Sequence, residues 1–174
     1  TIPQSVASIG KNAFGGCPIS TINGESGILR LTENCRMAPN AFAKCSFQTI
    51  VLDVSKPDKF IEIVENIGAT EIVVRDTINI ESFKRILSIP GLTSVSCIET
   101  DEPVLVSADE LGGMPVTLRS LELPRSVGKL DFFIFDDCEN LTTLKIPESV
   151  EQVLFEVELA NMKLQEITVP ADMY

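Results

Sequence analysis

The sequence contains no histidine and no tryptophan, and its one tyrosine is the last residue, Tyr174. Without histidine the chain has no Ser-His-Asp or Cys-His catalytic group, and it lacks the commonest metal ligand. The scarcity of Tyr and Trp also argues against sites that stack sugars or bases. No apolar run approaches the ~18 residues that span a bilayer, and no segment resembles a signal peptide. We therefore expect no cofactor, no metal site and no membrane insertion.

Basic residues are scarce as well, because 14 Lys and Arg stand against 25 Asp and Glu, a formal net charge of −11. An acidic surface repels phosphate groups, so we expect no nucleic-acid partner. Hydrophobic residues make up 44% of the 174 positions, which is enough for one folded domain with a sizeable core over residues 1–174. The chain starts at Thr1-Ile2-Pro3 without Met, and we expect it to be a fragment of a longer protein.

A repeated pattern runs through the chain. Residues 2–6, 121–127 and 146–150 align on a shared Pro-x-Ser-Val segment. In three copies a cysteine follows three residues after a phenylalanine, at Cys17, Cys45 and Cys138. An apolar anchor recurs at Ile22, Ile50, Ile72, Val95, Leu121, Leu144 and Ile167, with gaps of 28, 22, 23, 26, 23 and 23 residues. These gaps match the period of about 20–29 residues that is typical of leucine-rich repeats.

Each anchor begins a short strand with one buried face, because apolar residues lie two positions apart there. One such strand does not bury its face alone, so the strands are expected to stack as a parallel sheet over a continuous core. We predict an α/β fold, a right-handed solenoid with a parallel concave sheet of about seven short strands. The residues expected to be buried are Ile22, Ile50, Leu52, Ile72, Val74, Val95, Cys97, Leu121, Leu123, Leu144, Ile146, Ile167 and Val169.

The connections between strands are of two kinds. Most are short extended pieces and turns, but two show the apolar spacing of helices, at residues 60–67 and 80–87. Pro57 precedes the first helix and Gly68 follows it, while Asn79 is a candidate N-cap for the second. We therefore predict a convex side of mixed short strands, turns and two short helices.

The run Ile-Pro-x-Ser-Val-x-x-Ile-Gly-x-x-Ala-Phe-x-x-Cys, from Ile2 to Cys17, resembles the BspA-type leucine-rich repeat family. The resemblance is strong over residues 1–22, 34–52 and 118–150, and weaker over residues 53–117 and in the last repeat. It implies a non-catalytic, adhesion-type protein-binding module of a secreted or cell-surface protein, located outside the cell. Two alternatives are an accessory domain of a larger extracellular enzyme and a structural spacer in a repeat array.

The five cysteines include no C-x-x-C pair, so a zinc or redox motif is not indicated. Buried free thiols are the favoured interpretation, and a disulfide between Cys17 and Cys45 is the alternative. Three acidic pairs, at residues 101–102, 109–110 and 136–137, lack a calcium-loop signature and are predicted to be solvated turns.

Side chains between the buried ones are expected to point to the concave face, because side chains alternate along a strand. The candidate binding face comprises Val51, Val73, Glu71, Arg75, Ser96, Glu122, Lys145 and Thr168. Within it, Val51 and Val73 are expected to form an exposed apolar spot for a protein or peptide partner of unknown identity. At least one end strand is expected to be open, which would permit self-association.

Overall fold

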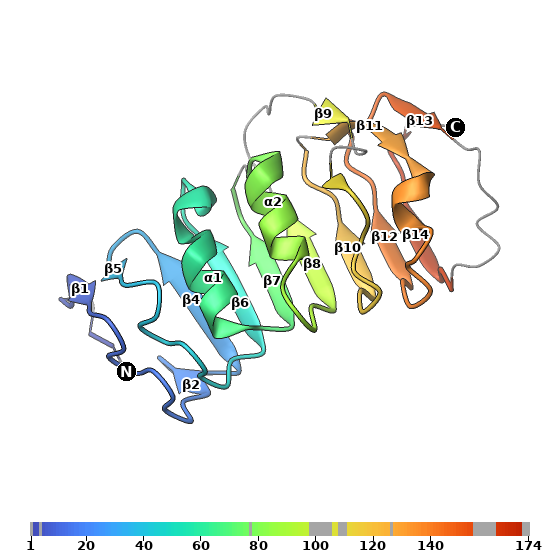
Figure 1. Ribbon diagram of the computed structural model, residues 1–174. Coiled ribbons are helices and arrows are strands. Elements are labelled where there is room, and N and C mark those ends of the chain that lie inside the picture. Colours follow the sequence, from blue (N-terminus) through green and yellow to red (C-terminus); the bar gives the residue numbers. More distant parts are fainter. Residues whose placement is uncertain are drawn as a thin grey trace.

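Seven parallel strands form one main sheet in the computed structural model, which describes residues 2–3, 5–76, 78–97, 106–107, 111–125, 127–154 and 163–171. The order across the sheet is β14-β12-β10-β8-β7-β6-β4 (Figure 1). The strands are β4 (Ile28–Thr32), β6 (Thr49–Asp53), β7 (Glu71–Val74), β8 (Ser94–Cys97), β10 (Ser120–Glu122), β12 (Thr143–Lys145) and β14 (Glu166–Thr168). Each strand lies beside the strand of the next repeat, which confirms the predicted α/β repeat solenoid.

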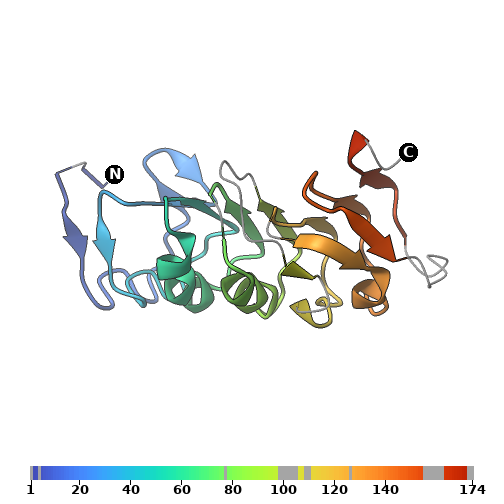
Figure 2. The ribbon, with the colours of Figure 1, turned by 90° about the horizontal axis from the view of Figure 1, so that it is seen from above.

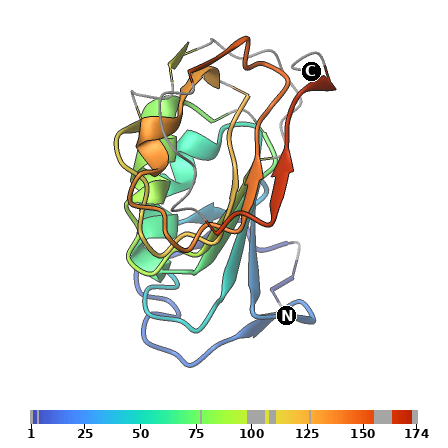
Figure 3. The same ribbon diagram turned by 90° about the vertical axis from the view of Figure 1, so that its right-hand side faces the viewer.

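Helices cover one face of the main sheet and leave the other face, here called the open face, without helices (Figures 2 and 3). The covering elements are α1 (Ile61–Ile67), the preceding 3-10 turn Pro57–Phe60, α2 (Ile80–Leu87) and the 3-10 turn Phe132–Phe135. Short strands complete the crossovers: β1 (Ser8–Ile9) pairs with β5 (Arg36–Met37), and β9 (Val106–Ser107), β11 (Val127–Asp131) and β13 (Gln152–Leu154) form a three-stranded sheet. The open face is the face that the sequence predicted to be concave.

Both helices begin and end where the sequence predicts. Pro57 lies in the turn that leads into α1, and Gly68 ends α1 in the left-handed conformation, with φ of 73°. Such a φ favours glycine because it has no Cβ. The Asn79 side chain accepts a hydrogen bond of 2.8 Å from the backbone N–H of Ser82, which confirms the N-cap of α2.

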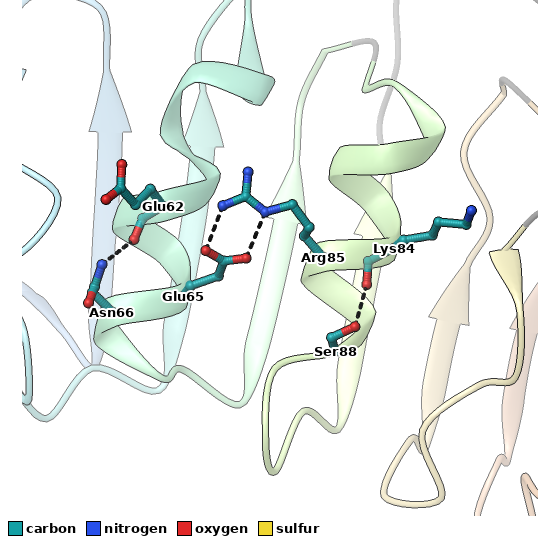
Figure 4. Close-up of polar contacts among 6 residues, drawn as sticks. All are labelled: Glu62, Glu65, Asn66, Lys84, Arg85 and Ser88. Carbon is teal, nitrogen blue, oxygen red and sulfur yellow. Dashed lines mark hydrogen bonds and ion pairs between the residues drawn. The ribbon is translucent and has the colours of Figure 1, made fainter.

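The two helices are also joined to each other. Arg85 of α2 donates two hydrogen bonds to the Glu65 carboxylate of α1, at 2.8 and 2.7 Å (Figure 4). This paired contact raises the pKa of Arg85, chiefly through the hydrogen bonds to Glu65. The guanidinium and carboxylate planes match in such a pair, so this partly exposed contact links the helices of two successive repeats.

One hydrophobic core runs through the solenoid, from Ile9 to Val150. The inward anchors of six strands are exposed by 1% or less: Leu29, Ile50, Ile72, Val95, Leu121 and Leu144. The predicted phenylalanine position is part of this core, since Phe42 and Phe135 are buried and Phe14 stacks on Phe42 with ring centres 5.0 Å apart.

The prediction for the first anchor was wrong. Ile22 is only half-buried and lies in β2 (Thr21–Ile22), which pairs antiparallel with β3 (Glu25–Ser26) as a small hairpin. The turn is Asn23-Gly24, with φ of 53° and 86°, and this residue pair is a typical two-residue hairpin turn. Leu29 of β4 is the true anchor because it lies opposite Ile50, and the first gap is therefore 21 residues rather than 28.

The predictions for the last two inward residues were also wrong. Ile167 is 46% exposed, and Val169 is half-buried. The reason is position, because among the strands that the structure describes β14 lies at the edge of the main sheet and pairs with β12 alone.

A ladder of backbone carbonyls links the repeats where each strand begins. The Gly27 carbonyl accepts from the N–H groups of both Gln48 and Thr49, and the Gln48 carbonyl accepts from both Thr70 and Glu71. The same double acceptance recurs at the carbonyls of Thr70, Thr93, Arg119 and Thr142. Each repeat is therefore held to the one before it by main-chain groups, whatever side chain occupies the position.

Candidate binding face of the main sheet

The middle positions of the seven strands form one row across the open face. The row consists of Arg30, Val51, Val73, Ser96, Glu122, Lys145 and Thr168, in register from strand to strand. The six residues after Arg30 were predicted. Glu71, at the start of β7, and Arg75, directly after its end, flank the row. Arg30 was missed because Ile22 had been taken as the first anchor. The alternation in Leu29-Arg30-Leu31, with 21 residues from Leu29 to Ile50, was the signal that could have found it.

Arg30 makes the first end of this row a small ionic cluster. Its guanidinium donates to the Glu25 carboxylate at 2.9 Å and lies 3.7 Å from a carboxylate oxygen of Asp53. The pKa of Arg30 is raised, first by the hydrogen bond to Glu25. Since Asp53 belongs to β6, the Arg30 side chain reaches from β4 towards the neighbouring strand.

The predicted apolar spot exists only in part. Val73 is partly exposed, but Val51 is buried, with 5% of its surface accessible. Val51 lies between Arg30 and Val73 in the row, and Arg30 extends across to Asp53 on the strand of Val51. A long side chain can cover apolar surface with its alkyl stem. Of the two valines, only Val73 therefore offers apolar surface to a partner.

Polar side chains on either side of Val73 are paired between strands. On β7 the exposed Glu71 accepts a hydrogen bond of 2.8 Å from the Thr49 hydroxyl of β6. Further along, the Glu122 carboxylate accepts from the Ser96 hydroxyl and from the Lys145 ammonium group. The pairing of Glu122 with Lys145 accounts for both charges as cross-strand contacts.

Two hollows lie where the strands of the sheet end. One, of about 420 Å³, contains Arg75 and is lined also by Glu33, Asp53, Ser55 and Asp76. The second, of about 390 Å³, contains three predicted residues, Glu122, Lys145 and Thr168. Val51, Glu71, Val73 and Ser96 lie in neither hollow, so the structure divides the predicted residues between two hollows and the stretch of sheet that separates them.

Several charged groups in the two hollows have an ion-pair or hydrogen-bond partner. In the second hollow Arg125 lies 3.9 Å from a carboxylate oxygen of Glu148, and Lys145 pairs with Glu122. In the first, Glu33 accepts hydrogen bonds from the hydroxyl and the backbone N–H of Ser55, and these bonds lower the pKa of Glu33. Paired charges of this kind suit a contact surface better than acid–base chemistry, which needs a group poised to exchange a proton.

Metal and membrane sites were also considered. Within the part of the chain that the structure describes, no group of three His, Cys, Asp or Glu side chains is placed to hold a metal ion. In the same residues no helix is long and apolar enough to cross a membrane. Asp136 and Asp137 are exposed, as predicted for a solvated turn, whereas the acidic pairs at 101–102 and 109–110 lie outside the described residues.

All five cysteines are free thiols, so the disulfide alternative for Cys17 and Cys45 is not realised. The Cys45 thiol instead donates to the backbone carbonyl of Phe14 at 3.2 Å. Burial raises the pKa of Cys45, and it raises the pKa of Cys138 to about 11. A thiol that stays protonated is a poor nucleophile, so Cys45 and Cys138 act as small core residues.

A match to a family model supports the repeat architecture. A family model described as BspA type leucine rich repeat region, in 6 copies, matches residues 1–67 and 114–174. A crystal structure of a leucine-rich repeat protein from Bacteroides ovatus ATCC 8483 is similar, with 15% identity and a TM-score of 0.35. The match covers 88% of this chain and 38% of that one, so the chain spans well under half the length of this relative. No curated protein matches the sequence.

Proposed function

The chain belongs to the BspA-type leucine-rich repeat family, and on that premise we propose that it is a non-catalytic module that binds a protein or peptide partner across its open face. The observation that carries the proposal is the arrangement of the main sheet. Helices and turns cover one face, and the other presents side chains from seven strands in register. Neighbouring strands lie about 4.8 Å apart, so such a row can contact an extended segment at many points.

The centre of the proposed binding face is β7. Val73 supplies partly exposed apolar surface there, while exposed Glu71 and Arg75 flank it with opposite charges. Ser96 continues the row on β8. Interfaces commonly combine an apolar centre with a polar rim. We therefore infer a partner segment with an apolar side chain over Val73 and charged groups complementary to Glu71 and Arg75.

The test is selection of binders from a displayed peptide library, followed by affinity measurement on variants. We expect Val73→Asp and Arg75→Glu each to raise the dissociation constant by about tenfold or more, since a loss of ~1.4 kcal/mol is tenfold. Lys84→Glu is the matched control, because Lys84 lies on α2 and contacts only Glu81 among the described ion pairs. Val51 is left unchanged, because an aspartate at this buried position would destabilise the fold.

The opposite mapping would contradict the proposal. If the selected peptides lose affinity for Lys84→Glu and keep it for Val73→Asp and Arg75→Glu, binding takes place on the helical side. Circular dichroism and thermal unfolding of each variant separate a loss of contact from a loss of fold.

We further propose that the module acts outside the cell, on a secreted or surface-attached protein with an adhesive role. The support is the resemblance of its repeat to those of secreted and surface proteins. Antibody labelling of intact cells against permeabilised cells tests this location. Labelling that appears only after permeabilisation would place the protein inside the cell and remove the adhesive role.

A further inference from the structure

We propose that the partner of the open face is an extended basic peptide segment that lies across the first residues of the strands, with Lys or Arg side chains about six positions apart. The inference rests on the proposed function, because it names the chemistry of the partner for the same face. The residues that carry it form a second row in register, here called the first row, beside the middle row. The first row consists of Thr49, Glu71, Ser94, Ser120, Thr143 and Glu166.

Three neighbouring strands present hydroxyl groups in the first row. Ser94 of β8 lies opposite Ser120 of β10, which in turn lies opposite Thr143 of β12. All three residues are partly exposed, and their hydroxyls have no hydrogen-bond partner among the residues that the structure describes. A hydroxyl group both donates and accepts hydrogen bonds. The centre of the first row therefore offers hydrogen-bonding groups that are still available to a partner.

The middle row differs because its polar groups are bonded to one another. The Glu122 carboxylate accepts from the Ser96 hydroxyl and from the Lys145 ammonium group. A partner that bonded to these groups would first have to break contacts that already exist, and the exchange would gain little. Polar recognition on this part of the open face is therefore expected along the first row rather than the middle row.

A carboxylate lies at each end of the three hydroxyls. Glu71 of β7 and Glu166 of β14 are both exposed, and in the described part of the chain neither of them forms an ion pair. The Thr49 hydroxyl that donates to Glu71 is neutral and leaves its charge uncompensated. The formal net charge of the chain is −11. Local and overall charge therefore both favour a basic partner.

The distance between the two carboxylates sets the spacing of the basic residues. Glu71 and Glu166 are separated by four strand-to-strand steps, through β8, β10 and β12. At ~4.8 Å for each step they lie roughly 19 Å apart, and an extended peptide rises ~3.4 Å per residue, so about six residues span the distance. Because side chains alternate along an extended chain, an even separation places both basic side chains on the side that faces the sheet.

The partner residues that face the sheet between the two basic ones are expected to be small and polar. They would lie about 7 and 14 Å from the first basic residue, above the hydroxyls of β8, β10 and β12. A side-chain amide both donates and accepts, which suits hydroxyls that do the same. The seven described strands of the main sheet contain no aromatic residue on which a sugar ring could stack. These features favour a peptide over a glycan.

Synthetic peptides test the proposal, with binding followed by NMR titration of isotope-labelled protein. The probe is a heptapeptide with arginine at its first and last positions, asparagine at the third and fifth, and alanine elsewhere. A comparison peptide of the same composition has its arginines three positions apart. We expect the probe to bind about threefold more tightly, because only the probe reaches both carboxylates at once. Added salt should reduce this preference.

Protein variants locate the contact. Glu71→Gln and Glu166→Gln each remove one charge at nearly constant size, and each should raise the dissociation constant of the probe by about threefold. Glu62→Gln is the matched control, because Glu62 is an exposed glutamate of α1 on the covered face of the sheet (Figure 4). The double variant Glu71→Lys and Glu166→Lys should reject the probe and bind a peptide with glutamate in place of both arginines, a result that loss of fold would not produce.

The outcomes separate this proposal from the proposed function. If selected peptides depend on Val73 and Arg75 but carry no basic pair and are unaffected by Glu71→Gln and Glu166→Gln, the open face binds peptides of another chemistry, and only this inference is overturned. If neither the selected peptides nor the probe shifts the signals of the open face, both proposals fail. Shifts in the first row caused by a neutral oligosaccharide, and none by the probe, would assign the hydroxyls to a glycan and also overturn the inference.

Discussion

The two ends of the solenoid differ in how they treat the same sequence pattern. At the N-terminal end of the solenoid, Leu29 and Leu31 of the edge strand β4 are exposed by 1% and 0%. At the C-terminal end, Ile167 of the edge strand β14 is 46% exposed and Val169 is half-buried. The difference lies in what surrounds each strand, because the β2–β3 hairpin and the first crossover lie around β4. Burial in a repeat protein therefore depends on the neighbours of a repeat as much as on its own motif.

The largest expected change in the free energy of unfolding comes from truncating an inward apolar side chain to alanine, and its size should differ between the two ends. Leu31→Ala should lower the free energy of unfolding by about 2–5 kcal/mol, because it leaves a cavity in a close-packed core. Ile167→Ala should lower it by about 1 kcal/mol or less, because a half-exposed side chain contributes only part of its transfer free energy. Urea unfolding of both variants provides the measurement, and equal losses would mean that the two ends are buried alike in solution.

Removal of the β2–β3 hairpin should leave the edge strand β4 less covered, as β14 is at the other end. Excising residues 21–26 is feasible because the Gly27 N–H already donates to the Ser20 carbonyl at 2.5 Å. Loss of the partly buried Ile22 should lower the free energy of unfolding by about 1–2 kcal/mol. Without the hairpin, Leu31→Ala should lower the free energy of unfolding by less than it does in the full chain, because Leu31 would then lie at a less covered edge. Additive effects in the double variant would show that the hairpin does not cover the core.

A smaller effect on stability is expected from the polar contact between Glu33 and Ser55, which joins the repeats of β4 and β6. Ser55 holds the Glu33 carboxylate, and its hydrogen bonds lower the pKa of Glu33 from an ordinary value of 4.5. A lowered pKa means that the stabilisation is present above the ordinary value and is lost as the pH falls through the folded value. Wild type should therefore be more stable than Glu33→Gln at pH near 7, and the difference should shrink in acid.

Thermal unfolding of both proteins from neutral to acidic pH measures this difference. Ser55→Ala serves as the partner control, since it removes the hydroxyl donor and should abolish part of the same pH dependence. A gap between wild type and Glu33→Gln that stays constant with pH would contradict the assignment of the shift to Ser55.

Sequence periodicity predicted most of the fold because each repeat is defined by the spacing of apolar residues that are close in sequence. Five of the seven anchors are buried in strands of the main sheet, as the spacing predicts, and both predicted helices are present. Ile22 was misassigned because it has the same apolar character as an anchor, and only the hairpin turn at Asn23-Gly24 distinguishes it. Ile167 was assigned correctly to a strand, but its exposure depends on the number of neighbouring strands.

The candidate binding face was predicted less completely than the fold. Alternation placed the row from Val51 to Thr168 on one face, as the register of the strands confirms. Alternation gave no information about long side chains that reach between strands, and for that reason the burial of Val51 was missed. Arg30 was missed because Ile22 had been taken as the first anchor. The hollows at the strand ends are formed by turns, whose shape is not encoded in a two-residue period.

The carbonyl ladder makes the rise of the solenoid independent of repeat length. The spacing between successive ladder positions varies from 21 residues, Gly27 to Gln48, to 26 residues, Thr93 to Arg119, yet each repeat docks on the same kind of main-chain acceptor. The backbone hydrogen bonds thus set a constant spacing between repeats. Additional residues form loops beside the main sheet, as the β2–β3 hairpin does. A repeat can therefore contain more or fewer residues between two ladder positions while the backbone contacts to its neighbours stay the same.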